Sequence, residues 1–235
     1  MLALLDERAP KSIRLSIERL GHRVLTLPPH PSLPSPIASH PDALLFFSDR
    51  AIYCTGSYFE MAHATLEIIS KHLSLPVLLT QEECGMDYPA DVLLNAARVG
   101  SHLFCLPDAT AEKLMADSSL HVCAVKQGYA KCSTIPVAET ALITSDRSIE
   151  KEAHKQGLDV LFVNADNVTL AGYDHGLIGG CASCAPYGGT NTILFSGDQH
   201  FPQWNDMYAF SLNHGNRLVP IGDGTPVDVG TIFLL

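Results

Sequence analysis

The sequence predicts an α/β fold in which a strand–strand–helix–strand unit occurs five times and the chain closes into a ring. Three observations predict it: apolar runs alternate with helix-like segments, hairpin-length turns join pairs of apolar runs, and a last apolar run at the C-terminus has no helix after it. We expect residues 1–235 to form one such domain. An open α/β sheet, which also alternates strands with helices, is the main alternative.

The helices are predicted by apolar residues that share one helical face. Ile13 and Ile17 stand at i and i+4, and the segment 62–69 carries apolar residues at i, i+4 and i+7. A further helix begins near Ile149, with Asp146 available as its N-cap. Shorter helical segments are expected at 112–116 and 204–212. A glycine typical of a helix C-cap follows three of the helices, at Gly21, Gly157 and Gly215.

The strands are predicted by apolar runs on both sides of each helix. The run before the helix recurs at intervals of about 40 to 50 residues, at Leu2, Ile52, His102, Ala141 and Ile193. Leading extended segments precede four of these runs, at 42–47, 91–99, 131–137 and 180–186. The first unit lacks a leading strand, and the C-terminal run 227–235 would supply it. Such closure would remove the exposed sheet edges of an open array.

Composition restricts the classes of function. Hydrophobic residues make up 46% of the chain and charged residues 17%, which is typical of a compact globule and not of a disordered chain. The formal net charge of −10 disfavours binding to nucleic acid. No run approaches the roughly 18 apolar residues of a membrane span, and we expect a cytoplasmic protein. An odd number of cysteines, 7, predicts free thiols in a reducing compartment.

The repeated unit closed by a terminal strand resembles the pentein superfamily, the five-bladed α/β propellers of guanidino-group-modifying enzymes. The stretches ASHPD (38–42), QGYAKCS (127–133) and YDHGLIGGCASC (173–184) look like an uncharacterised bacterial branch near this superfamily. The resemblance implies a central channel lined by the leading strands, with a small polar molecule bound in it and with neither nucleic acid nor membrane as partner. No cofactor is expected.

The sequence departs from the family's catalytic pattern at two places. Catalytic relatives use a cysteine after the last helix and a histidine in the leading strand of the fourth unit, where this chain has no cysteine in 221–235 and QGYAKCS at 127–133. The resemblance therefore implies a rearranged site, in which Cys132 is the best remaining nucleophile. Lys131 would favour its thiolate, but neighbours along a strand point to opposite faces. The alternative is that Cys132 packs in the core and Lys131 is a solvated charge.

Other polar residues fall on the predicted channel strands. His40 and Asp42 are two apart, share a strand face, and would serve as a base and a guanidinium-binding carboxylate; a turn entering the strand is the alternative. Asn95 and Arg98 interrupt an apolar strand, and Arg98 could bind a substrate carboxylate, Asp42 or a structural partner. Asp228 would line the channel or hold the turn before the last strand.

Cys181 and Cys184 form a single C-x-x-C motif. One such pair is a weak zinc signal, and the further ligands would have to be His175 and His200, at no fixed spacing. We therefore expect structural thiols and no metal, with Cys181 in the channel-lining segment. No P-loop, dinucleotide-binding or metalloprotease motif is present.

Two functions follow from these observations. The first is an enzyme, a hydrolase or amidinotransferase that acts on C–N bonds of a small guanidino- or amide-containing molecule with a cysteine nucleophile. The second is a non-catalytic module on the same scaffold that binds a small molecule or a protein.

Overall fold

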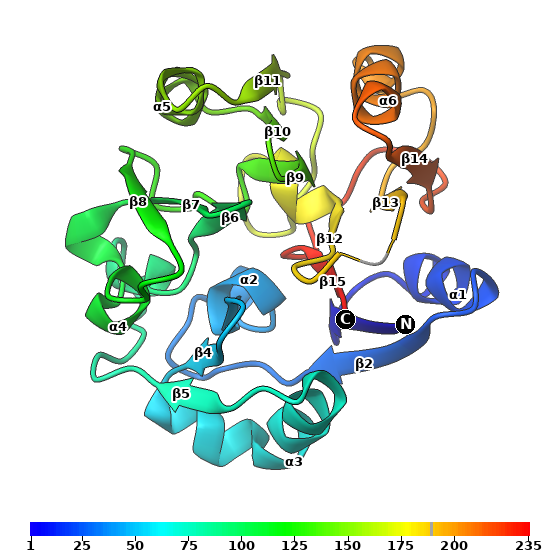
Figure 1. The fold of residues 1–235 in the computed structure, drawn as a ribbon. Coiled ribbons are helices and arrows are strands. Elements are labelled where there is room, and N and C mark those ends of the chain that lie inside the picture. The colour runs from blue at the N-terminus through cyan, green and yellow to red at the C-terminus, as the bar shows by residue number, and fades with distance from the viewer. Residues whose placement is uncertain (189) are drawn as a thin grey trace.

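The computed structural model describes residues 1–188 and 190–235 and confirms a mixed α/β fold. The strands form five separate sheets. Figure 1 shows these sheets around a central region, with the long helices on the outside. The helices are α1 (Lys11–Arg19), α2 (Pro41–Leu44), α3 (Gly56–Leu73), α4 (Glu112–Met115), α5 (Arg147–Lys155) and α6 (Trp204–Asn213), with 3-10 turns η1 (Ser35–Ile37), η2 (Ala90–Val92), η3 (Pro107–Ala109) and η4 (Ile178–Cys181).

Three of the sheets are built alike, from an antiparallel strand pair, a helix and a third strand parallel to the second. They contain β3 (Phe46–Phe47), β4 (Ile52–Cys54) and β5 (Val77–Leu79); β6 (Ala97–Val99), β7 (His102–Cys105) and β8 (His121–Ala124); and β9 (Thr134–Ala138), β10 (Ala141–Thr144) and β11 (Asp159–Phe162). Each follows the predicted strand–strand–helix–strand order.

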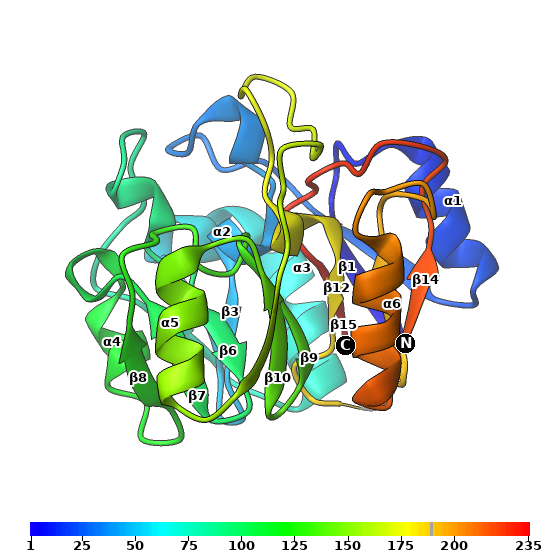
Figure 2. The ribbon, with the colours of Figure 1, turned by 90° about the horizontal axis from the view of Figure 1, so that it is seen from above.

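The C-terminal strand pairs with the first unit, as the sequence predicts. β15 (Ile232–Leu234) lies antiparallel to β1 (Leu2–Asp6), and β1 is parallel to β2 (Arg23–Leu27). Leu2 and Leu235 exchange backbone hydrogen bonds of 2.9 and 2.8 Å, so the two ends of the chain lie side by side (Figure 2).

The fifth unit differs from the prediction. β13 (Thr192–Phe195) pairs with β14 (Arg217–Pro220), but the leading strand β12 (Ser183–Cys184) pairs with β15 instead. A single bridge between Ala182 and Phe195 remains of the expected hairpin. Within the described residues each sheet is open, and none closes on itself.

The predicted leading strands are shorter than expected, because their first residues leave the sheet. Residues 41–44 form α2, which begins at Pro41, a residue that lacks an N–H and suits the first helical position. Residues 90–92 and 178–181 form η2 and η4, and Ser133 N–H closes a turn on the carbonyl of Tyr129. The turn at 129–133 bonds to two of the other segments, since Cys132 Sγ donates to Asp42 and the Tyr129 hydroxyl donates to Asp91.

The helices bury the faces that the sequence predicts. Ile13 and Ile17 of α1 are buried, as are the apolar residues of α3 at 62, 66 and 69. Asp146 caps α5 by accepting from the N–H groups of Ser148 and Ile149. No helix in the described part of the chain has the length and apolar character needed to span a membrane.

Buried thiols make the stability depend on pH. Burial raises the pKa values of Cys54 and Cys84 from 9.0 to about 12. Above pH 9 the unfolded chain loses these protons while the folded chain keeps them, so the free energy of unfolding falls as pH rises toward 12. Each thiol contributes a slope of about 1.4 kcal/mol per pH unit.

Urea denaturation at pH 8, 10 and 11 measures this effect. The Cys54→Ala variant is expected to show a flatter decline than the wild type, although it is less stable at pH 8. Equal urea midpoints for the wild type at pH 8 and 10 would contradict the prediction.

Candidate functional site

A group of polar side chains meets in the interior, each at most 4% exposed. We call it the polar cluster; it comprises His40, Asp42, Asn95, Lys131, Cys132, Asp228 and Thr231. Its members come from chain segments that are far apart in sequence: the start of α2, the segment before β6, the turn before β9 and the segment before β15.

The Asp42 carboxyl group lies at the centre of the polar cluster. It accepts hydrogen bonds from Asn95 Nδ2 (3.2 Å), Cys132 Sγ (3.0 Å) and Thr231 Oγ1 (2.8 Å). Helix α2 positions it, and its own N–H donates to the carbonyl of Gly230 (3.1 Å). His40 and Asp42 therefore share a helix start and not the strand face that the sequence suggests.

Asn95 holds the backbone on which Cys132 stands. Its Oδ1 accepts from the N–H groups of Lys131 (2.9 Å) and Cys132 (3.2 Å), while its Nδ2 donates to Cys132 Sγ (3.1 Å) as well as to Asp42. The amide thus fixes the position of the thiol relative to the carboxyl group.

Lys131 and Cys132 both contribute to the polar cluster. The Lys131 Nζ donates to Thr231 Oγ1 (2.9 Å) and to the carbonyl of Thr134 (3.1 Å). Lys131 and Cys132 do not lie in a strand, because residues 129–133 form a turn and β9 begins only at Thr134. Strand alternation does not apply there.

Burial, followed by the charges of Asp42 and Asp228, raises the pKa of the Cys132 thiol well above its ordinary value. The ammonium group of Lys131 therefore does not make this cysteine acidic, in contrast to the sequence-based expectation. At neutral pH the group is a thiol that donates its proton to Asp42.

His40 lies between two carboxyl groups but bonds to neither. Its Nε2 is 3.8 Å from Asp6 Oδ2 and its Nδ1 is 3.9 Å from Asp228 Oδ1, both beyond normal hydrogen-bond distance. Gly230, at φ 66°, lies so close that a Cβ there would overlap the imidazole.

Asp228 holds the segments around it. Its carboxylate oxygens accept from the N–H groups of Gly230 (3.0 Å) and Leu177 (2.9 Å). A Cβ on Gly180 would overlap this carboxylate. Burial raises the pKa of Asp228, while the neighbouring His40 lowers it. Asp228 therefore both enters the polar cluster and holds the turn before the last strand.

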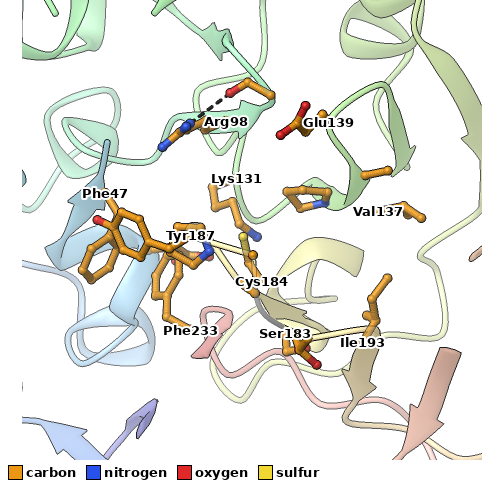
Figure 3. A pocket seen from close by; sticks show the side chains of 18 of the residues that line it. Phe47, Arg98, Lys131, Val137, Glu139, Ser183, Cys184, Tyr187, Ile193 and Phe233 are labelled. Atoms are coloured by element: carbon orange, nitrogen blue, oxygen red, sulfur yellow. Dashed lines mark hydrogen bonds between the residues drawn. The ribbon is translucent and has the colours of Figure 1, made fainter. Parts of the chain in front are cut away.

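A pocket of about 660 Å³ adjoins the polar cluster, since Asp42 and Lys131 belong to both. Figure 3 shows Lys131 pointing into it between Arg98 and Glu139 on one side and the rings of Phe47 and Tyr187 on another. Arg98 pairs with Asp49 (2.6 Å) and donates to the carbonyl of Gly100 (3.0 Å), so it lines the pocket without reaching Asp42.

The two cysteines of the C-x-x-C motif lie in different surroundings. Cys184 lines the pocket, whereas Cys181 lies outside its lining and its Sγ donates to the carbonyl of Leu177 (3.5 Å). His200, one of the further ligands considered, is an exposed side chain paired with Asp198. Burial raises the pKa values of both thiols.

A model of a family of unknown function (DUF6873) matches residues 4–233. The chain belongs to this family. No curated protein shows significant similarity to this chain.

Solved structures similar to this DUF6873 chain include dimethylarginine dimethylaminohydrolases (DDAH). A cysteine-to-serine mutant of DDAH from Pseudomonas aeruginosa, complexed with citrulline, has a TM-score of 0.56 at 10% identity over 94% of this chain and 91% of that one. A histidine-to-glycine mutant, solved as an adduct with S-methyl-L-thiocitrulline, has a TM-score of 0.56 at 10% identity over 94% and 92%. At 10% identity these similarities show a shared fold.

Thr231 of this DUF6873 chain has no role that the sequence predicts. Thr231 is fully buried and has φ 68°, a conformation that β-branched residues rarely adopt. The one local signal is the polar run GDGTPVDVGT directly before an apolar strand. Backbone strain of this kind is concentrated at functional sites.

Proposed function

We propose that residues 1–235 form a pentein-type propeller, whose five sheets are the blades and whose channel holds the pocket. We further propose that the chain is a hydrolase or transferase that cleaves a C–N bond of a small guanidino- or amide-containing molecule. The observation that carries the proposal is the Cys132 thiol, which is hydrogen-bonded to Asn95 and to Asp42, a residue that lines the 660 Å³ pocket. The fold-level likeness to DDAH supports it.

The proposed chemistry needs Cys132 as nucleophile and Asp42 as its proton acceptor. Sγ gives its proton to Asp42 Oδ2, 3.0 Å away, and forms a bond to the amidinium or amide carbon. The C–N bond then breaks, and the leaving amine takes a proton. Water, or an acceptor amine in a transferase, releases the product from sulfur. A cationic substrate would also lower the cost of forming a thiolate in a buried site.

Compared with the catalytic pattern that the resemblance implies, the groups of this site come from different segments of the chain. The segment 127–133 supplies Cys132 where the resemblance implies a histidine, and the C-terminal segment supplies Thr231 where it implies a cysteine. His40, from the segment 38–42, is the histidine of the polar cluster.

A non-catalytic module that binds a small polar molecule is the second candidate. The raised pKa of Cys132, caused first by burial, favours it, because a neutral thiol is a poor nucleophile. The missing cysteine in 221–235 points the same way.

Alkylation with a matched pair of probes separates the two candidates. The cation 2-chloroacetamidine has the shape of a guanidinium, and 2-chloroacetamide is its neutral counterpart. At pH 7 and in EDTA, we expect the cation to alkylate Cys132 at least about tenfold faster, because Asp42 attracts it. Mass spectrometry of the peptides identifies the cysteine, and Cys184, which lines the pocket, is the internal control. Equal rates for the two probes, or no labelling of Cys132, would instead support the binding module.

A further inference from the structure

We propose that His40, Asp42 and Cys132 form a binding site for a divalent transition-metal ion of the Zn²⁺ type. One ligand atom from each residue lies within 4.8 Å of the other two, and all three residues are buried. Imidazole, carboxylate and thiolate are the protein donors that Zn²⁺ takes. Among the residues that the structure describes, these three bring their ligand atoms together, and the C-x-x-C motif takes no part in the group.

An unpartnered imidazole nitrogen supports this inference independently. His40 is 2% exposed, and among the described residues its Nδ1 has no hydrogen-bond partner. Buried polar atoms without a partner are rare and destabilising. A metal ion bound to the imidazole would remove this cost.

The charges of the surroundings favour a cation. Asp42 and Asp228 lie in the polar cluster, and the ammonium group of Lys131 bonds to Thr231 and a carbonyl and not to either carboxylate. Asp6, the other carboxylate near His40, is paired with Arg8 (2.8 Å). Two buried carboxylates thus lie near one ammonium group, and a divalent cation would compensate the excess negative charge.

Further hydrogen bonds would orient the ligands. Asn95 Nδ2 donates to both Cys132 Sγ and Asp42 Oδ1, and Thr231 Oγ1 donates to Asp42 Oδ2. Partners of this kind fix ligand geometry in metal sites. Asp42 also lines the pocket, which gives an ion a route to the site.

Binding would exchange a proton for the metal ion. The Cys132 thiol loses its proton to solvent, and the resulting thiolate forms a bond to M²⁺, so one proton is released for each ion bound at this residue. Three protein ligands leave a fourth position for water or another ligand. A metal-bound thiolate is a weaker nucleophile than a free one, so this inference does not rest on the proposed function but predicts that metal and alkylating probes compete.

Cobalt spectroscopy tests the site directly. EDTA-treated and dialysed full-length protein is titrated with Co²⁺, and we expect one ion per chain with a thiolate-to-cobalt charge-transfer band that Zn²⁺ removes. Cys132→Ser and His40→Ala should abolish the band or weaken binding about 10- to 100-fold. Cys181→Ser is the matched control and should keep the band. A band that persists in Cys132→Ser, a band lost in Cys181→Ser, or no binding at one equivalent would each overturn the proposal.

A second readout uses only the wild-type protein, in case a variant fails to fold. Zn²⁺ should protect Cys132 from iodoacetamide, and EDTA should restore its labelling; unchanged labelling would overturn the metal site. The rate at which 2-chloroacetamidine alkylates Cys132 in EDTA measures the reactivity of the thiol without metal. If the metal does not bind, the alkylation of Cys132 by 2-chloroacetamidine can still be observed. If that alkylation fails, metal binding can still be observed.

Discussion

The Asp42→Asn variant is expected to change two alkylation rates of Cys132 by different factors. Asp42 is the largest electrostatic cause, after burial, of the raised pKa of Cys132. Its neutral isostere should lower that pKa, increase the thiolate fraction at pH 7 and accelerate labelling by iodoacetamide by about tenfold for each pKa unit. The same change removes the negative charge that attracts an amidinium, so labelling by 2-chloroacetamidine should slow by about tenfold relative to iodoacetamide.

Asp49→Asn provides the matched control, since Asp49 also lines the pocket but pairs with Arg98. Both rates should stay near the wild-type values in this variant. Circular dichroism verifies that Asp42→Asn is folded, because the substitution also disturbs the bonds from Asn95 and Thr231. If both probes slow together in a folded Asp42→Asn protein, Asp42 does not control the thiol electrostatically.

The Gly179→Ala variant is expected to be strongly destabilised. A Cβ at this position would overlap the backbone carbonyls of Lys131 and Thr134 and lie 2.5 Å from the Thr134 nitrogen. Backbone cannot move aside as a side chain can, so the turn that carries Cys132 must shift. We expect a loss of about 3 kcal/mol in the free energy of unfolding, in the range of overpacked cores.

Urea denaturation measures this loss as a lower midpoint at an unchanged slope. Gly224→Ala is the control, because a Cβ there meets nothing within 4 Å. The shift of the turn should also expose Cys132, so that iodoacetamide labels it faster in Gly179→Ala than in Gly224→Ala. A midpoint equal to that of the control would show that η4 and the turn are not packed as closely as described.

The centres of the sheets were predictable because local physics determines them. The second strand of each unit is an apolar run, and the runs at Ile52, Ala141 and Ile193 all became strands of the predicted type. The pairing of β15 with β1 was predictable because an apolar run without a following helix needs a strand partner. These signals lie within a few residues of the elements that they predict.

The polar ends of the leading strands were not predictable in the same way. Their conformation is determined by hydrogen bonds between distant segments, such as those from Asn95 to residues 131 and 132 and from Thr231 to Asp42. Nothing near Lys131 in sequence indicates that its neighbours form a turn, to which strand alternation does not apply. Thr231 has no motif, and its role depends on groups more than 50 residues away.

The pairing of β15 with β1 has a consequence for biosynthesis. During translation, β1 is made long before its partner β15, and Asp42 lacks its Thr231 donor until residues 228–234 leave the ribosome. The nascent chain can form the middle sheets earlier, since their contacts are local. The sheet that contains β1 and the polar cluster can be completed only after β15 is made, so a ribosome stalled shortly before Asp228 would hold a chain with an unpaired β1 edge and no assembled site.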